Sequence, residues 1–141
     1  MTHQRATRFL NAPLDRVRHA LLDPQALPEW NPAFRSLNGP ARAATGTRYL
    51  ITVRGELSGT WEYTRIDDHD IDTTWQVPGF RETGTWHLRP HGHGTIVTHE
   101  FRHKGPLARL LSKAYRGVAE LRLDRLTQRT AAAASPADAD S

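Results

Sequence analysis

The sequence contains no cysteine, so neither disulfide bonds nor thiolate chemistry can contribute to its structure or function. No apolar run approaches the roughly 18 residues of a membrane-spanning helix, and the first residues lack the apolar region of a signal peptide. A Gly-rich phosphate-binding loop and a G-x-S-x-G motif are also absent, which argues against nucleotide-dependent chemistry and serine hydrolysis. These absences predict a soluble, cytoplasmic protein.

The 141 residues predict a single domain, because a chain of this length can bury roughly two thirds of its unfolded surface. Its 19 basic residues outnumber its 15 acidic residues, but they are scattered and no nucleic-acid-binding motif occurs, so we expect no nucleic-acid partner. A local basic excess between residues 105 and 130 is interpreted as a solvated helix face, with contact to nucleic acid or an anionic membrane as the alternative. Its members are Arg109, Lys113, Arg116, Arg122, Arg125 and Arg129.

Residues 8–32 predict a strand, a helix, a second short helix and then an aromatic corner at Trp30. Asn11 is expected to cap the first helix, with Pro13 just inside its first turn. Asp23-Pro24 ends this helix, because the residue before a proline is disfavoured in the helical conformation. The apolar stripe of the helix consists of Leu14, Val17, Leu21 and Leu22.

Strand-like segments separated by turn residues predict an antiparallel meander in the rest of the chain. The expected strands are residues 4–10, 47–57, 60–66, 71–77, 83–89 and 95–103. Ser58-Gly59 is expected to form a tight hairpin, and the segment between Trp30 and residue 47 is expected to be a loop. Alternation along the strands predicts one inward face, which carries Tyr49, Ile51, Val53, Leu57, Trp61, Tyr63, Arg65, Trp75, Val77, Trp86, Leu88, Val97, His99, Phe101 and His103.

Gly105-Pro106 ends the last strand and predicts the start of one long helix. About 20 helical residues would extend ~30 Å, enough to cross the whole sheet. The apolar stripe of this helix is Leu107, Leu110, Leu111, Ala114, Val118 and Leu121, widened by Tyr115, Leu123 and Leu126. Small and acidic residues without periodicity predict that residues 131–141 are a disordered tail, which leaves a folded domain of residues 1–130.

Several short motifs carry a resemblance to a known family. They are Asn11–Val17, Leu27–Trp30, Gly59–Tyr63, Gly84–Trp86 and His99–Phe101 running into Gly105-Pro106. With these motifs the chain resembles the START-like (SRPBCC) superfamily, and within it the polyketide cyclase/dehydrase and lipid-transport group. The resemblance implies an α+β helix-grip fold, in which a curved antiparallel sheet wraps around a long C-terminal helix and two short helices follow strand 1.

The resemblance also implies a cavity between the sheet and the C-terminal helix that binds a hydrophobic or aromatic small molecule such as a lipid, sterol or polyketide. Polar groups on such an apolar face need partners, which a ligand or a structural hydrogen-bond network can supply. Trp30, Asn31 and Phe34 are expected at the mouth. Leu110, Ala114 and Val118 are expected to close the cavity. Its walls are expected to comprise Tyr49, Val53, Trp61, Tyr63, Arg65, Trp75, Trp86, His99 and Phe101.

Two alternative functions remain open. In a polyketide cyclase, aromatase or dehydratase, Arg65, Tyr63 and His99 would polarise a carbonyl and shuttle the proton. Aromatic cyclases of the group place a tyrosine shortly after the Trp30-like corner, whereas Phe34 has no hydroxyl, and this difference favours binding over catalysis. The other alternative is an interaction module that acts on a partner protein, which a cavity filled by its own tryptophans would favour.

We expect neither a metal nor a cofactor. His91-Gly92-His93 is interpreted as part of a solvated hairpin, because no third ligand of the metal-binding type accompanies it. Asp67–Asp70 likewise is interpreted as a polar turn, since its spacing does not match a calcium-binding loop. The sequence leaves a homodimer open.

Overall fold

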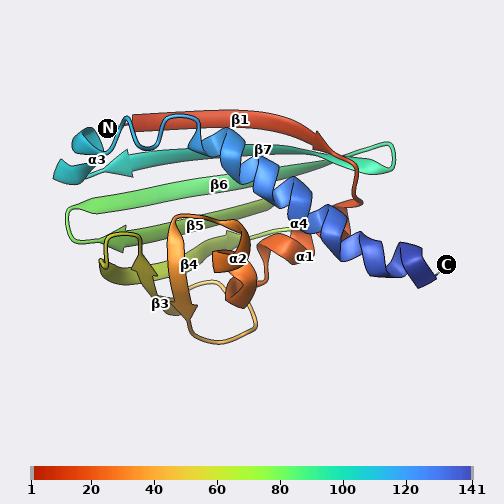
Figure 1. The fold of residues 1–141 in the computed structure, drawn as a ribbon, viewed down its shortest axis with the longest axis horizontal. Coiled ribbons are helices and arrows are strands. Elements are labelled where there is room, and N and C mark those ends of the chain that lie inside the picture. Colours follow the sequence, from red (N-terminus) through yellow and green to blue (C-terminus); the bar gives the residue numbers. More distant parts are fainter. Residues whose placement is uncertain (1, 141) are drawn as a thin grey trace.

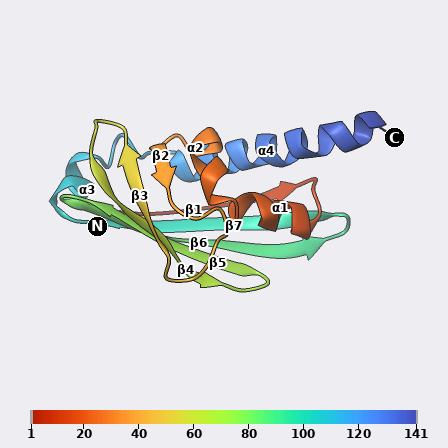
Figure 2. The ribbon, with the colours of Figure 1, turned by 90° about the horizontal axis from the view of Figure 1, so that it is seen from below.

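The computed structural model describes residues 2–140 (Figure 1). Within these residues, a seven-stranded antiparallel sheet has the strand order β1-β7-β6-β5-β4-β3-β2. The helices α1, α2 and α4 all lie on one side of the sheet, as Figure 2 shows. The elements are β1 (Thr2–Leu10), α1 (Leu14–Leu21), η1 (Pro24–Ala26), α2 (Leu27–Trp30), β2 (Phe34–Asn38), β3 (Arg48–Val53), β4 (Ser58–Ile66), β5 (Asp70–Val77), β6 (Phe80–His91), β7 (Gly94–Lys104), α3 (Pro106–Leu110) and α4 (Val118–Asp140).

The predicted α+β architecture is confirmed, with a curved sheet, two short helical segments after β1 and a C-terminal helix across the sheet. Sheet and helix are joined at β1, where Arg8 forms ion pairs with Glu120 and Asp124 of α4. Alternation in β6 and β7 buries every second side chain, so the helix-facing side of these strands is mostly apolar, with Glu82, His99 and His103 among its buried polar members.

Helix α1 buries Val17 and Leu21, as its apolar spacing predicted. Its expected cap is wrong, because Pro13 occupies the N-cap position with extended backbone angles and no side chain caps the helix. The proline ring fixes φ near the observed −65°, so the chain can enter the helix without a cap from Asn11.

Two further corrections concern the region around β3. The expected loop contains a short strand, β2, which pairs with β3 and is interrupted by a register shift between Phe34 and Ser36. The β3–β4 hairpin turns at Gly55 and Glu56, which both have positive φ, and the backbone N–H of Val53 donates to the Leu57 carbonyl. Ser58-Gly59 therefore lies inside β4 and does not form the turn.

The C-terminal helix is not continuous, contrary to the prediction. Helix α3 ends at Leu110, and α4 begins at Val118 after a stretch of turns that ends at Gly117 with φ of +78°. Glycine adopts this left-handed conformation without a steric penalty, so it allows the chain to change direction before α4. Helix α4 continues to Asp140, and residue 141 lies outside the described residues; the domain boundary at residue 130 and the disordered tail stay predictions.

None of the helices described in residues 2–140 combines the length and the apolar character needed to cross a membrane.

Candidate functional site

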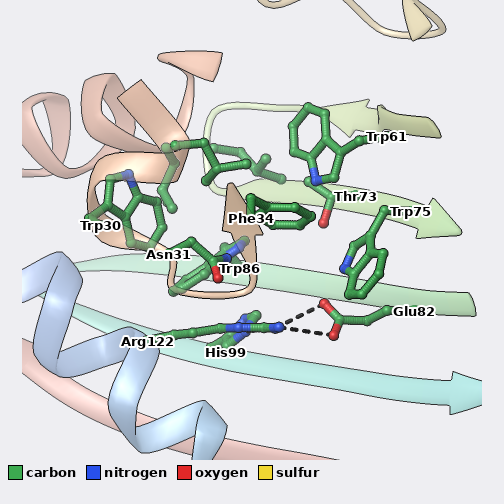
Figure 3. Close-up of a pocket in the computed structure, with 13 residues that line it drawn as sticks. Trp30, Asn31, Phe34, Trp61, Thr73, Trp75, Glu82, Trp86, His99 and Arg122 are labelled. Carbon is green, nitrogen blue, oxygen red and sulfur yellow. Dashed lines mark hydrogen bonds and ion pairs between the residues drawn. The ribbon is translucent and has the colours of Figure 1, made fainter. Parts of the chain in front are cut away.

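A small cavity lies between the sheet, the segment around α2 and helix α4 (Figure 3). Its volume is about 20 Å³, which is little more than the space of one water molecule. The four tryptophans of the chain all border it. The residues that line this inner cavity are Leu21, Leu27, Trp30, Asn31, Phe34, Trp61, Ile71, Thr73, Trp75, Glu82, Trp86, His99 and Arg122.

A buried ion pair forms one wall of the inner cavity. Arg122 extends from α4 toward the sheet, where its guanidinium meets the carboxylate of Glu82 on β6 (Figure 3). The guanidinium also lies 4.6 Å from the ring centroid of Phe101, so the face of this aromatic ring covers one side of the charged group. Removing two charges from water is costly, and the bidentate geometry and the aromatic contact offset part of that cost.

His99 on β7 extends this polar cluster. Its Nδ1–H donates to the Thr85 carbonyl at 3.1 Å, since a carbonyl can only accept. Its Nε2 therefore carries a lone pair and accepts a hydrogen bond from Nη1 of Arg122 at 3.3 Å. The imidazole ring is stacked on Trp86, with ring centroids 3.7 Å apart. This packing holds His99 in one orientation at the cavity wall.

The electrostatics of the cluster follow from burial and charge. Burial opposes ionisation of Glu82, but the Arg122 charge and hydrogen bonds from His103 and Arg122 outweigh it and lower its pKa to about 2. Burial, assisted by the Arg122 charge, lowers the pKa of His99 to about 3. At neutral pH Glu82 is ionised and His99 is neutral, so the charges of Arg122 and Glu82 balance each other.

Three buried N–H groups on residues that line the inner cavity have no hydrogen-bond partner in the described part of the chain. They are Nε1 of Trp30, Nε1 of Trp75 and Nε of Arg122. The Trp75 nitrogen faces the middle of the group of side chains drawn in Figure 3. A buried polar group without a partner costs about 1–3 kcal/mol, so this concentration of free donors distinguishes the cavity from ordinary core.

A larger, open groove adjoins the inner cavity. It has a volume of about 310 Å³, and its walls are mainly aliphatic and aromatic side chains. Asn31 and Trp75 line both spaces, so these two side chains lie between the groove and the cavity. The residues that line this outer groove are Asn31, Pro32, Ala33, Val53, Arg54, Leu57, Trp75, Val77, Phe80, Leu107, Leu111, Ala114, Tyr115, Val118 and Leu121.

The structure distributes the residues expected at the ligand site over three locations. The inner cavity contains Trp30, Asn31, Phe34, Trp61, Trp75, Trp86 and His99. The outer groove contains Asn31, Val53, Trp75, Ala114 and Val118. Neither space is lined by Tyr49, Tyr63, Arg65, Phe101 or Leu110.

Arg65 does not face inward as its strand phase predicted. A register shift between Tyr63 and Arg65 reverses the alternation in β4, and Arg65 pairs instead with Asp67 at the surface. Tyr63 is buried, and its hydroxyl donates to the Leu21 carbonyl at 2.6 Å. The structure therefore does not bring Arg65 and Tyr63 together with His99 at one cavity. Their catalytic roles stay a prediction that this geometry does not favour.

Sequence reasoning missed the two charged residues of the inner cavity. The predicted position of Arg122 on a solvated helix face is wrong, because its side chain is only 1% exposed. Arg122 lies four residues after Val118 and four before Leu126, so its place on the apolar stripe was the available signal. Glu82 likewise alternates in phase with Phe80 and Trp86 on β6.

The fold and the cavity under the C-terminal helix define a helix-grip domain of the START-like class. The chain belongs to the family described as polyketide cyclase / dehydrase and lipid transport, which it matches over residues 1–131. The predicted resemblance is thereby confirmed. No curated protein matches the sequence.

Solved structures support the same fold. A START superfamily protein from Mycobacterium smegmatis has a TM-score of 0.73 at 18% identity, covering 91% of this chain and 96% of its own. A protein from Chromobacterium violaceum has a TM-score of 0.70 at 20% identity, with 91% and 96% covered. A protein from Thermus thermophilus has a TM-score of 0.67 at 24% identity, with 94% and 99% covered. At these identities the likeness establishes the fold alone.

Proposed function

We propose that this protein binds an apolar or aromatic small molecule, with the body of the ligand in the outer groove. The observation that carries the proposal is an open groove of about 310 Å³ with mainly apolar walls, adjoining a buried cavity with unpaired donors. Concave apolar sites with a few convergent polar groups are typical of small-molecule binding. The family, which includes lipid transport in its description, is consistent with this function.

The position of the ligand in this proposal differs from the sequence-based expectation. The inner cavity alone is too small for a lipid or polyketide, because its volume is only about 20 Å³. The outer groove is bounded on one side by the segment between α3 and α4, which contributes Leu111, Ala114 and Tyr115. Trp75 lines both the groove and the cavity, so a ligand in the groove contacts its side chain.

A titration with the fluorescent apolar dye N-phenyl-1-naphthylamine tests this proposal. Ala114→Trp places a large side chain on the groove wall, and we expect dye affinity at least about tenfold lower, equivalent to about 1.4 kcal/mol. Leu110→Trp is the matched control, because Leu110 lies four residues earlier at the end of α3, is 78% exposed and does not line the groove. Equal affinity of both variants and the unmodified protein would contradict the proposed site.

The small volume of the inner cavity, about 20 Å³, favours a second candidate, an interaction module that acts on a partner protein. Such a module needs no ligand space, and its aromatic interior would serve stability alone. Failure of the unmodified protein to bind the dye at all would favour the interaction module over the ligand-binding function.

A further inference from the structure

The buried side-chain atoms without a partner on the residues that line the inner cavity are all of one kind. Every buried side-chain atom that lines this cavity and lacks a partner, among the described residues, is an N–H donor, on Trp30, Trp75 and Arg122. Asp72, whose Oδ1 is also unpaired, does not line the inner cavity. An occupant that satisfies these groups therefore has to accept hydrogen bonds and has no need to donate them.

Two of these donors are held rigidly. Both terminal nitrogens of the Arg122 guanidinium are committed to Glu82, which leaves Nε as its one nitrogen without a partner among the described residues. The Trp75 ring packs against Phe34 and Phe80, each with ring centroids 5.2 Å away. Preorganised donors of this kind favour a fixed acceptor, since little side-chain freedom is lost when the hydrogen bond forms.

The charge of the cluster selects among acceptors. Arg122 is already neutralised by Glu82, and a second carboxylate beside it would be repelled by the ionised Glu82. A neutral oxygen that accepts without carrying charge avoids this repulsion. A water molecule also fits the volume and accepts from these donors, so a ligand oxygen that binds here has to displace it.

We propose that the inner cavity receives the neutral carbonyl oxygen of a ketone or ester whose apolar body lies in the outer groove, with Trp75 Nε1–H and Arg122 Nε–H as donors. This inference rests on the proposed function and adds the chemical class of the ligand. Trp75 borders both spaces, so one indole supplies an apolar face to the body and a donor to the oxygen.

Three probes of similar shape test the inference by isothermal titration calorimetry. They are 2-acetylnaphthalene, which has a neutral carbonyl, 2-ethylnaphthalene, which has no oxygen, and 2-naphthoate, which is an anion. We expect the ketone to bind at least about tenfold more tightly than the hydrocarbon, as one well-made buried hydrogen bond permits. The carboxylate is expected to bind more weakly than the ketone.

The variant Trp75→Phe removes the indole N–H and keeps an aromatic ring. It is expected to reduce the ratio of ketone affinity to hydrocarbon affinity toward one, whatever its effect on overall binding. Tyr49→Phe is the matched control, because it also removes a donor from a buried ring, one whose hydroxyl donates to Pro40 away from both spaces. For Tyr49→Phe, the ratio of ketone affinity to hydrocarbon affinity is expected to equal that of the unmodified protein.

The outcomes separate the two claims. Equal affinity for ketone and hydrocarbon would overturn the carbonyl inference while leaving the binding function in place. An unchanged ratio in Trp75→Phe, or tighter binding of the carboxylate, would also overturn it. Failure of all three probes to bind would overturn both the inference and the proposed function on which it rests.

Discussion

Arg122 and Glu82 form a bidentate ion pair between α4 and β6, with Nη1–Oε2 at 2.9 Å and Nη2–Oε1 at 3.0 Å. Their side chains are 1% and 4% exposed. The pair therefore connects the C-terminal helix to the sheet at the wall of the inner cavity, where water cannot replace either partner.

Removing one member of this pair should destabilise the fold strongly. Arg122→Met leaves the buried Glu82 without its counter-charge, and we expect a loss of about 3–5 kcal/mol in the free energy of unfolding. The double variant with Glu82→Gln should recover a large part of this loss, because no unpaired charge remains. Urea denaturation of both single variants and the double variant measures the coupling. Strict additivity of the two single losses would contradict the role assigned to the pair.

Stability should fall as the pH is lowered through the acid range. Between about pH 6.5 and pH 3, an unfolded His99 binds a proton that the folded protein excludes, so its contribution is lost as the pH falls. Glu82 adds a loss in the same direction from about pH 4.5 toward pH 2. The slope from His99 should reach about 1.4 kcal/mol per pH unit. His99→Gln should flatten the profile between pH 4.5 and 6.5; an identical profile would disprove the assignment.

Tyr63 should stabilise the fold without affecting ligand affinity. Burial raises the pKa of its hydroxyl, which stays protonated and donates to the Leu21 carbonyl at the end of α1. Tyr63→Phe leaves that carbonyl unpaired, at a cost of about 1–3 kcal/mol. Thermal unfolding and the dye titration provide the two measurements. Lost affinity with unchanged stability would point to a ligand role for Tyr63.

Two glycines with positive φ should differ sharply in their tolerance of alanine. A Cβ at Gly105 would lie 2.4 Å from the Gly79 carbonyl oxygen, which accepts a hydrogen bond from Leu107 at the start of α3. A Cβ at Gly92 would meet open space. Gly92→Ala should cost only the backbone strain, about 1–2 kcal/mol. Gly105→Ala should cost clearly more, and similar unfolding midpoints for both variants would contradict the packing described here.

The parts of the fold that sequence reasoning predicted well are those with undisturbed periodicity. In β7, the alternation of Val97, His99, Phe101 and His103 gives the inward face directly, and all four are buried. The prediction failed at Arg65, where a register shift changes the phase of β4. A single strand pattern carries no signal for such a shift, because it depends on the pairing with β5.

The candidate site was harder to predict for a related reason. Arg122 and Glu82 are single charged residues within apolar patterns, and charged side chains are seldom fully buried unless paired. Recognising their burial requires knowing that they face one another across α4 and β6, 40 residues apart in the chain. The outer groove likewise depends on the interruption between α3 and α4, which the apolar stripe alone does not reveal.

Ligand binding in the outer groove is tested most directly by a titration of isotope-labelled protein with 2-acetylnaphthalene, followed by nuclear magnetic resonance. We expect the Trp75 indole N–H signal and the backbone signals of Val77 and Val118 on the outer groove to move together and saturate. Signals of Thr64 and Glu100, which lie on a different part of the surface, should stay in place. Saturating shifts at Thr64 and Glu100 with an unmoved Trp75 signal would contradict binding of the ligand in the outer groove.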